Sequence, residues 1–230
     1  LAIGTNRMAK RNVIIRRLPA VEGLGSCTLI ASDKTGTLTM DQQSAKAICL
    51  PNGKMLSVTG DGYNGTGAIK NEREENVPAT DELLFNFLQS ALLSNEGILR
   101  KTGDQWEHSG DAVDVALRAL AYKAGKQPDY FSKDITIVEL VPYESERKYS
   151  GVFYRSGGQL YFSMKGAVEI IGPHLSETGK ELCFAASENM AEAGYRVLAL
   201  AAGMVSSTDI PDIGELEDRK STRLNSSHTI

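Results

Sequence analysis

The residues best suited to chemistry lie near the start of the chain, in the sequence Asp-Lys-Thr-Gly-Thr-Leu-Thr at residues 33–39. They follow an apolar run at residues 28–32, which predicts a short buried strand. A carboxylate at the end of such a strand, followed by a turn with glycine, lies where open α/β sheets place their reactive groups. Asp33 could attack a phosphoryl group and form an acyl phosphate, while Lys34 and the turn amides could hold phosphate oxygens. The alternative is an ordinary turn.

This heptapeptide resembles the phosphorylation motif of the P-type ATPases, ion pumps that pass through an aspartyl phosphate. The resemblance implies that Asp33, Lys34 and Thr35 form the catalytic site, and that Asp33 and the Thr35 carbonyl are ligands of Mg²⁺. Related phosphatases of haloacid-dehalogenase type usually carry a second Asp two residues after the nucleophile, where this chain has Thr35. Without that general base to activate water, an acyl phosphate should persist longer, as a pump requires. A phosphatase is therefore the less favoured alternative.

Two later stretches resemble parts of the nucleotide-binding domain of the same family. Residues 109–117 resemble a helix start whose carboxylate, here Asp114, reaches the adenine amino group. Alternatively, Asp114 only complements the helix dipole. Residues 142–148 resemble a segment in which an aromatic ring, here Tyr143, stacks on adenine, followed by a basic pair that includes Lys148. Alternatively, Tyr143 is a core residue at a strand end.

Two further stretches complete the resemblance. Residues 162–169 contain a Lys-Gly-Ala motif, in which Lys165 would contact the nucleotide and Gly166 would allow close approach of the backbone. Residues 194–200 match a Gly-aromatic-Arg strand whose arginine, Arg196, could pair with phosphates. The cofactors that the resemblance implies are ATP and Mg²⁺. The absence of a Cys-x-x-Cys sequence and of a His-Pro pair argues against the soft-metal pumps, whereas the Lys-Gly-Ala and Gly-aromatic-Arg motifs resemble those of the hard-cation pumps. Within that group, the basic N-terminal stretch and residues 58–60 most resemble the calcium-type branch.

Composition limits the partners of the chain. A net charge of −4 over 230 residues leaves no electrostatic footprint for nucleic acid. The three scattered cysteines, Cys27, Cys49 and Cys183, argue against a disulfide or zinc framework and suit a reducing compartment. The longest apolar run, at residues 197–205, is far shorter than the roughly 20 residues that span a bilayer. A basic run at residues 1–17 is either a solvated face or a juxtamembrane stalk. We therefore expect a soluble piece from the cytosolic face of a membrane pump, whose absent transmembrane helices would bind the transported cation.

Hairpin strands and helices occur in separate runs, which indicates an α+β fold with an antiparallel sheet and flanking helices. To this the resemblance adds the first strand of a haloacid-dehalogenase-like α/β phosphorylation domain. The predicted helices are residues 80–95 (capped by Thr80 and ended by Gly97), 111–124 (capped by Asp111) and 180–193. The predicted hairpins are residues 44–59 and 151–164, and the other strands are residues 135–141 and 195–202.

The domain boundaries follow from these patterns. Residues 1–41 should form the stalk end and the first part of the phosphorylation domain, and residues 42–205 the nucleotide-binding domain. Residues 206–230 should be an irregular tail, and residues 220–230, which resemble translated vector sequence, are excluded as non-native. A formal Gly-x-Gly-x-x-Gly sequence at residues 60–65 should be a loop rather than a dinucleotide site, because no amphipathic helix follows it.

The predicted function is the cytosolic ATP-binding and aspartyl-phosphorylation region of an ATP-driven cation pump. The later family motifs, which carry further Mg²⁺-binding aspartates, do not occur in this sequence. A second hypothesis is therefore a module that binds ATP without turning it over.

Overall fold

The computed structural model describes residues 2–14, 16, 17, 23, 25–29, 31, 32, 42–206, 208 and 226–229, and it divides the chain into two compact units, Leu1–Asp41 and Gln42–Ile230. The first unit contains the helix α1 (Ala2–Ala9). Asp33, Lys34 and Thr35 lie outside the described residues. The predicted buried strand at residues 28–32 is wrong for the residues described there, since Thr28, Leu29, Ala31 and Ser32 form no strand and Leu29 is 84% exposed. A buried parallel strand needs neighbouring strands, and no described strand pairs with these residues. The phosphorylation domain itself stays a prediction. No helix in the described part of the chain is long and apolar enough to cross a membrane.

The second unit is built on an antiparallel sheet in the order β3-β2-β1-β10-β9-β8-β7-β6. Its strands are β1 (Ala47–Cys49), β2 (Met55–Val58), β3 (Ile69–Lys70), β6 (Ile135–Glu144), β7 (Tyr149–Ser156), β8 (Gln159–Gly166), β9 (Ala199–Met204) and β10 (Ser226–Thr229). A separate hairpin pairs β4 (Ile98–Thr102) with β5 (Gln105–Ser109). The predicted α+β class with an antiparallel sheet is confirmed.

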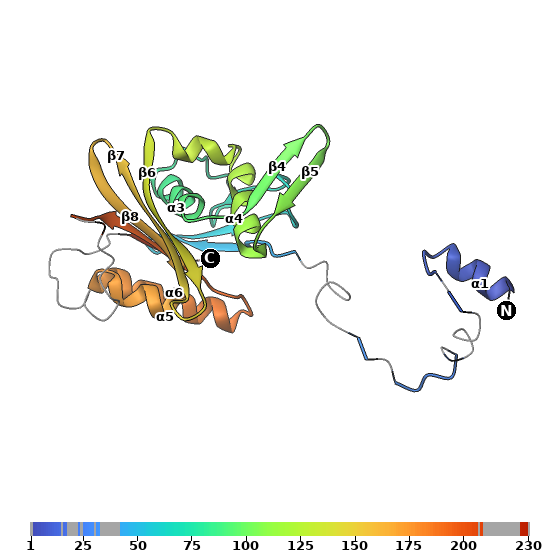
Figure 1. Cartoon of the computed structure of the whole chain (residues 1–230). Helices are drawn as coiled ribbons and strands as arrows, with labels where there is room; N and C mark the ends of the chain where they lie inside the picture. Colours follow the sequence, from blue (N-terminus) through green and yellow to red (C-terminus); the bar gives the residue numbers. More distant parts are fainter. Residues whose placement is uncertain are drawn as a thin grey trace. The chain divides into compact units, whose positions relative to one another are not determined.

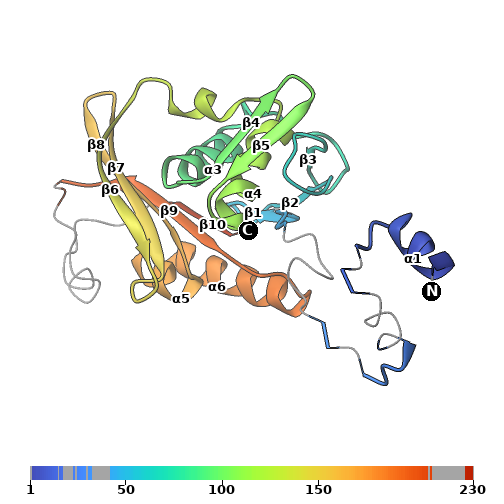
Figure 2. The ribbon, with the colours of Figure 1, turned by 45° about the vertical axis from the view of Figure 1, so that its right-hand side comes forward.

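Helices cover both faces of this sheet (Figures 1 and 2). The helices are α3 (Glu82–Leu93), α4 (Ala112–Lys123), α5 (Val168–Ile171) and α6 (Glu177–Glu192), with 3-10 turns η2 (Pro128–Ser132) and η3 (Gly172–His174). Neighbouring strand residues point to opposite faces. Thus Ile48 and Leu200 pack in the cluster that contains α3 and α4, whereas Cys49 and Ala199 pack in clusters with residues of α5 and α6.

The helix ends show how well local sequence signals predicted where each helix begins and ends. The predicted cap of α4 is confirmed, since Oδ1 of Asp111 accepts a hydrogen bond from the Val113 N–H (2.8 Å). The predicted cap of α3 is wrong, because Asp81, rather than Thr80, accepts from the Leu84 N–H (3.0 Å). The predicted end at Gly97 is also wrong. The helix ends at Leu93, and Ser94 at its C-cap donates both its N–H (3.4 Å) and its hydroxyl (2.9 Å) to the Ser90 carbonyl.

The two predicted hairpins are confirmed. The connection of β7 to β8 has only two residues, Gly157 and Gly158, and both have positive φ (+56° and +82°), as the commonest two-residue hairpin turn requires. The predicted strand at residues 195–202 is wrong in its first half. Its partner strand β8 ends at the Gly166–Ala199 pair, so residues 195–198 have no strand beside them there and form a connection.

Two elements were missed from the sequence. The β4–β5 hairpin carries few apolar residues, so it shows no clear alternation. The prediction of an irregular tail is wrong for Ser226–Thr229, whose backbone pairs with β9 and β1. Backbone pairing satisfies peptide groups whatever the side chains are, so hydropathy could not indicate this strand.

Candidate functional site

A cavity of about 720 Å³ lies in the second unit, between the first turn of α4 and the adjacent ends of β6 and β8. Six of the residues that line it were predicted from the sequence as nucleotide ligands: Asp114, Tyr143, Lys148, Lys165, Gly166 and Arg196. They come from four separate stretches of the chain. The structure therefore brings together every site residue that was predicted within residues 42–205.

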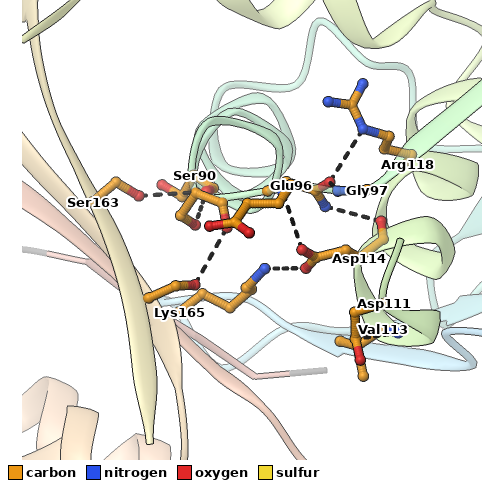
Figure 3. Close-up of polar contacts among 12 residues, drawn as sticks. Ser90, Glu96, Gly97, Asp111, Val113, Asp114, Arg118, Ser163 and Lys165 are labelled. Carbon is orange, nitrogen blue, oxygen red and sulfur yellow. Dashed lines mark hydrogen bonds and ion pairs between the residues drawn. The ribbon is translucent and has the colours of Figure 1, made fainter. Parts of the chain in front are cut away.

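At the centre of the site, Lys165 and Asp114 form an ion pair (Figure 3). Lys165 is the penultimate residue of β8, and Asp114 lies in the first turn of α4. Their side chains are only 8% and 12% exposed. A charge buried this deeply is tolerated when a counter-charge and further hydrogen bonds accompany it. Asp114 therefore does more than complement the helix dipole.

The loop before β4 holds Asp114 from the other side. The Glu96 N–H donates to Oδ2 of Asp114 (3.0 Å), and the Asn95 side-chain amide donates to the Asp114 carbonyl (2.9 Å). Nε of Arg118 in turn donates to Oδ1 of Asn95 (3.1 Å). Burial lowers the pKa of Arg118, and the nearby charges of Asp129 and Asp114 oppose this shift. Each oxygen of the Asp114 carboxylate thus has a fixed partner.

Behind Lys165, serine hydroxyls fill the contact between α3 and the sheet. Oγ of Ser163 donates to the carbonyl of Ser90 (3.4 Å), and Oγ of Ser150 donates to the carbonyl of Ser94 (3.5 Å). Buried hydroxyls cost little when they are hydrogen-bonded in this way. These contacts fix β7 and β8 against α3 and so fix the strand that carries Lys165.

Gly166 allows two backbone segments of the protein to approach each other very closely. A Cβ atom at this position would lie 2.4 Å from the carbonyl oxygen of Lys148. That carbonyl accepts a hydrogen bond from the Ala167 N–H (3.1 Å), and Lys148 itself has a positive φ of 56°. The glycine of the Lys-Gly-Ala motif is therefore required by packing against residue 148.

The remaining predicted ligands lie at the open side of the cavity. Tyr143, near the end of β6, is 59% exposed, so the alternative that it is a core residue is wrong. Arg196 is also exposed, in the connection before β9. Nζ of Lys148 pairs with Oε1 of Glu169 (3.3 Å). A hydrogen bond from its own backbone and this contact with Lys148 lower the pKa of Glu169.

Several lining residues were missed as site residues. Gln43, Ser44 and Ala45 form part of the wall, and Glu96 and Ser145 also line the cavity. Nothing in the types or spacing of Gln43, Ser44, Ala45 and Glu96 indicates a site, because only the fold brings them there, whereas Ser145 lies within the stretch at residues 142–148 that was predicted to contribute to it.

The predicted catalytic and Mg²⁺-binding residues Asp33, Lys34 and Thr35 lie outside the described part of the chain, so their roles stay predictions. In the part that is described, no group of three or more His, Cys, Asp and Glu side chains is arranged to hold a metal ion.

Comparison with known proteins places the chain in a family. Residues 84–228 match the model of the P-type ATPase cytoplasmic domain N. A probable cation-transporting ATPase F of Mycobacterium tuberculosis is 37% identical over 224 residues, which cover 92% of this chain and 24% of that protein. The cation-transporting ATPase pma1 of Synechocystis sp. is 37% identical over 216 residues (87% and 24%). The calcium-transporting ATPase type 2C member 2 of Mus musculus is 31% identical over 236 residues (94% and 23%).

The chain spans about a quarter of the length of these relatives. The family match, however, covers more than half of the chain and includes all six of the predicted residues that line the cavity. The chain belongs to the P-type ATPases, and residues 84–228 correspond to the cytoplasmic domain N of that family.

Proposed function

We propose that this cavity binds ATP and that the chain is the cytosolic nucleotide-binding region of an ATP-driven cation pump. One observation carries the proposal: six residues predicted as ligands, from four separate stretches, line a single cavity. Its volume of about 720 Å³ is within the range of small-molecule sites, about 300–1,000 Å³.

The chemistry of the lining suits a nucleotide. The exposed ring of Tyr143 offers a face for the adenine base, and such stacking contributes about 1–3 kcal/mol per base. The Asp114 carboxylate would accept a hydrogen bond from the adenine amino group. Lys148 and Arg196 would pair with phosphate oxygens. Because Lys165 already neutralises Asp114, the buried end of the cavity presents a polar surface with no net charge from this pair.

The experiment is a titration of the chain with ATP, ADP and AMP, using variants of exposed residues that leave the core intact. Tyr143→Ala should weaken binding of all three nucleotides about fivefold or more, whereas Tyr143→Phe should retain it. The matched control is Leu140→Ala, which removes an equally exposed side chain (58%) from the same strand outside the cavity. Arg196→Ala should weaken ATP more than AMP. Absence of binding by the wild type, or equal affinity in Tyr143→Ala and Leu140→Ala, would defeat the proposal.

For the intact protein, we propose that the carboxylate of Asp33 attacks the γ-phosphorus of ATP, so that an acyl phosphate forms and ADP leaves. Lys34 would stabilise the transferring group. Asp33 and the Thr35 carbonyl would hold Mg²⁺, which neutralises phosphate charge when bound. Asp33→Asn in a full-length protein should abolish the acid-stable, hydroxylamine-sensitive phosphoenzyme and spare ATP binding. If the Asp33→Asn protein still retains label from γ-labelled ATP, Asp33 is not the nucleophile.

We further propose that the pump is of calcium type. This chain would lie at the cytosolic face of its membrane. The support is the similarity to proteins described as calcium-transporting, alongside others described only as cation-transporting. Phosphorylation of the full-length protein should then require Ca²⁺. Equal phosphoenzyme levels with Ca²⁺ and with a calcium chelator would contradict this.

A second candidate function is nucleotide binding without turnover by this chain alone. It is favoured because the described residues that line the cavity all lie between Gln43 and Leu198, so the second unit can hold a nucleotide without a contribution from Asp33. The chain should therefore bind ATP and yield no phosphoenzyme. Stable label on the wild-type chain would contradict this candidate.

A further inference from the structure

The formal Gly-x-Gly-x-x-Gly sequence is confirmed as a loop, and this loop is tightly closed at its base. A Cβ atom on Gly60 would lie 2.0 Å from the carbonyl oxygen of Thr66, and one on Gly67 would lie 2.1 Å from that of Thr59. Both glycines also have positive φ, +77° and +129°. The two ends of the loop therefore cross in contact, and only glycine fits at the crossing.

Inside the loop, Tyr63 connects two walls of the cavity. Its hydroxyl accepts a hydrogen bond from the Gln43 N–H (3.3 Å) and donates one to the Ala112 carbonyl (3.3 Å). Gln43 lines one wall, and Ala112 lies between Asp111 and Val113, which line another. The Tyr63 side chain is buried (6% exposed), and its ring meets His108 edge to face, with 4.8 Å between the ring centroids.

Two more contacts tie the loop to the same segments. The Gly62 N–H donates to the hydroxyl of Ser44 (2.9 Å), the neighbour of Gln43 in the wall. Nζ of the buried Lys123, the last residue of α4, donates to the carbonyl of Gly60 (2.8 Å). The loop thus contacts the wall at residues 43–44 and both ends of α4.

We infer that Tyr63 is a positioning residue of the nucleotide cavity, and that its hydroxyl fixes the distance between Gln43 and the start of α4, which carries Asp114. Tyr63 is not among the residues that line the cavity, so it acts through the two walls that it joins. The inference rests on the proposed nucleotide-binding function. Because hydrogen-bond geometry sets the spacing of the walls, loss of the hydroxyl should affect ligand affinity more than stability.

Tyr63→Phe tests this, because it removes the hydroxyl and keeps the buried ring. The chain offers a matched control in Tyr122→Phe. Tyr122 packs in the same apolar cluster, and its hydroxyl donates to the Leu99 carbonyl (3.2 Å), away from the cavity lining. In the full chain, Tyr63→Phe should weaken ATP binding about three- to tenfold. Tyr122→Phe should leave affinity within about twofold while lowering the melting temperature to a similar extent.

Amide hydrogen exchange supplies a readout at the bridge itself. The Gln43 N–H should exchange faster in Tyr63→Phe than in the wild type, and Tyr122→Phe should not change it. If the wild type binds ATP and both variants bind equally, or if Gln43 exchange is unchanged, the inference about Tyr63 is wrong and the proposed function stands. Failure of the wild type to bind ATP would overturn both.

Discussion

Lys165 and Asp114 are joined across the cavity in an ion pair that links the end of β8 to the first turn of α4. The pair also fixes the 95–97 loop, because the second carboxylate oxygen accepts from the Glu96 N–H. Two residues that were predicted separately as ligands therefore hold each other in place. The geometry of the buried end of the site depends on both.

Lys165→Met should destabilise the protein strongly, because it leaves the Asp114 carboxylate buried without its counter-charge. Removal of one partner of a buried pair typically costs about 3–5 kcal/mol in free energy of unfolding. The measurement is urea denaturation. The control is the double variant Lys165→Met with Asp114→Asn, which removes both charges and should be more stable than Lys165→Met alone. Equal destabilisation of the single and double variants would show that the pairing of charges is not the cause.

Gly166→Ala should lower the free energy of unfolding by about 1–3 kcal/mol, as overpacking does, and should weaken ATP binding. The added methyl group would lie 2.4 Å from the Lys148 carbonyl oxygen, so either β8 or the turn at Lys148 must move. Gly4→Ala, at a helical position with nothing within 4 Å, is the matched control and should not lower stability. Denaturation and nucleotide titration of both variants check this, and an unchanged Gly166→Ala protein would contradict the close approach.

Stability should fall between about pH 10 and pH 12 because of Tyr154. Burial, and secondarily the neighbouring Tyr161, raises the pKa of Tyr154 to about 12. Below pH 10 the phenol is protonated in both states, so it adds no pH dependence. Above pH 10 the unfolded chain loses this proton while the folded chain keeps it, and stability falls by roughly 2–3 kcal/mol by pH 12.

Tyr154→Phe should remove most of that loss when urea denaturation is followed at several alkaline pH values. Tyr195→Phe, which alters an exposed tyrosine, should show the same slope as the wild type. An identical slope in Tyr154→Phe would assign the alkaline loss to other groups.

The three cysteines should react with iodoacetamide at very different rates. Cys27 is exposed, whereas Cys49 and Cys183 are buried. Burial raises the pKa of the Cys49 thiol, and Cys183 raises it further, so less of the reactive thiolate is present at neutral pH. Mass spectrometry at pH 8 should find Cys27 modified in the native protein and all three cysteines modified in urea. In the Cys27→Ser variant, rapid labelling of native Cys49 would contradict the buried packing of β1 against α6.

Local signals predicted much of this fold. The Asp111 cap determines where α4 begins, and the two glycines at residues 157–158 determine the β7–β8 turn. Both signals act between residues close in the chain, so they can be read without knowing the fold. The order of the strands in the sheet cannot be read from such local signals. Strand β1 lies beside β10, and β3 lies at one edge of the sheet, because of pairings between distant segments.

The same limit holds for the site, where local sequence signals were predictable and contacts between distant segments were not. Motif resemblance identified six residues that line the cavity. It did not indicate that Lys165 would pair with Asp114, which is 51 positions away in the sequence. Gln43 and Tyr63 carry no motif of their own that points to the cavity. Their roles depend on where the Gly60–Gly67 loop crosses and which wall it contacts, and these are properties of the packed unit.

Because the cavity is lined by residues from Gln43 to Leu198, its two extreme contributors lie far apart in the unit's sequence. The β7–β8 hairpin can form early, since local contacts close only short loops, whereas contacts between distant segments form more slowly. During synthesis, the first wall would emerge long before the residues that complete the cavity. The ability to bind ligand is thus acquired late and as a whole, and it reports that the segments from Gln43 to Leu198 have reached their native arrangement.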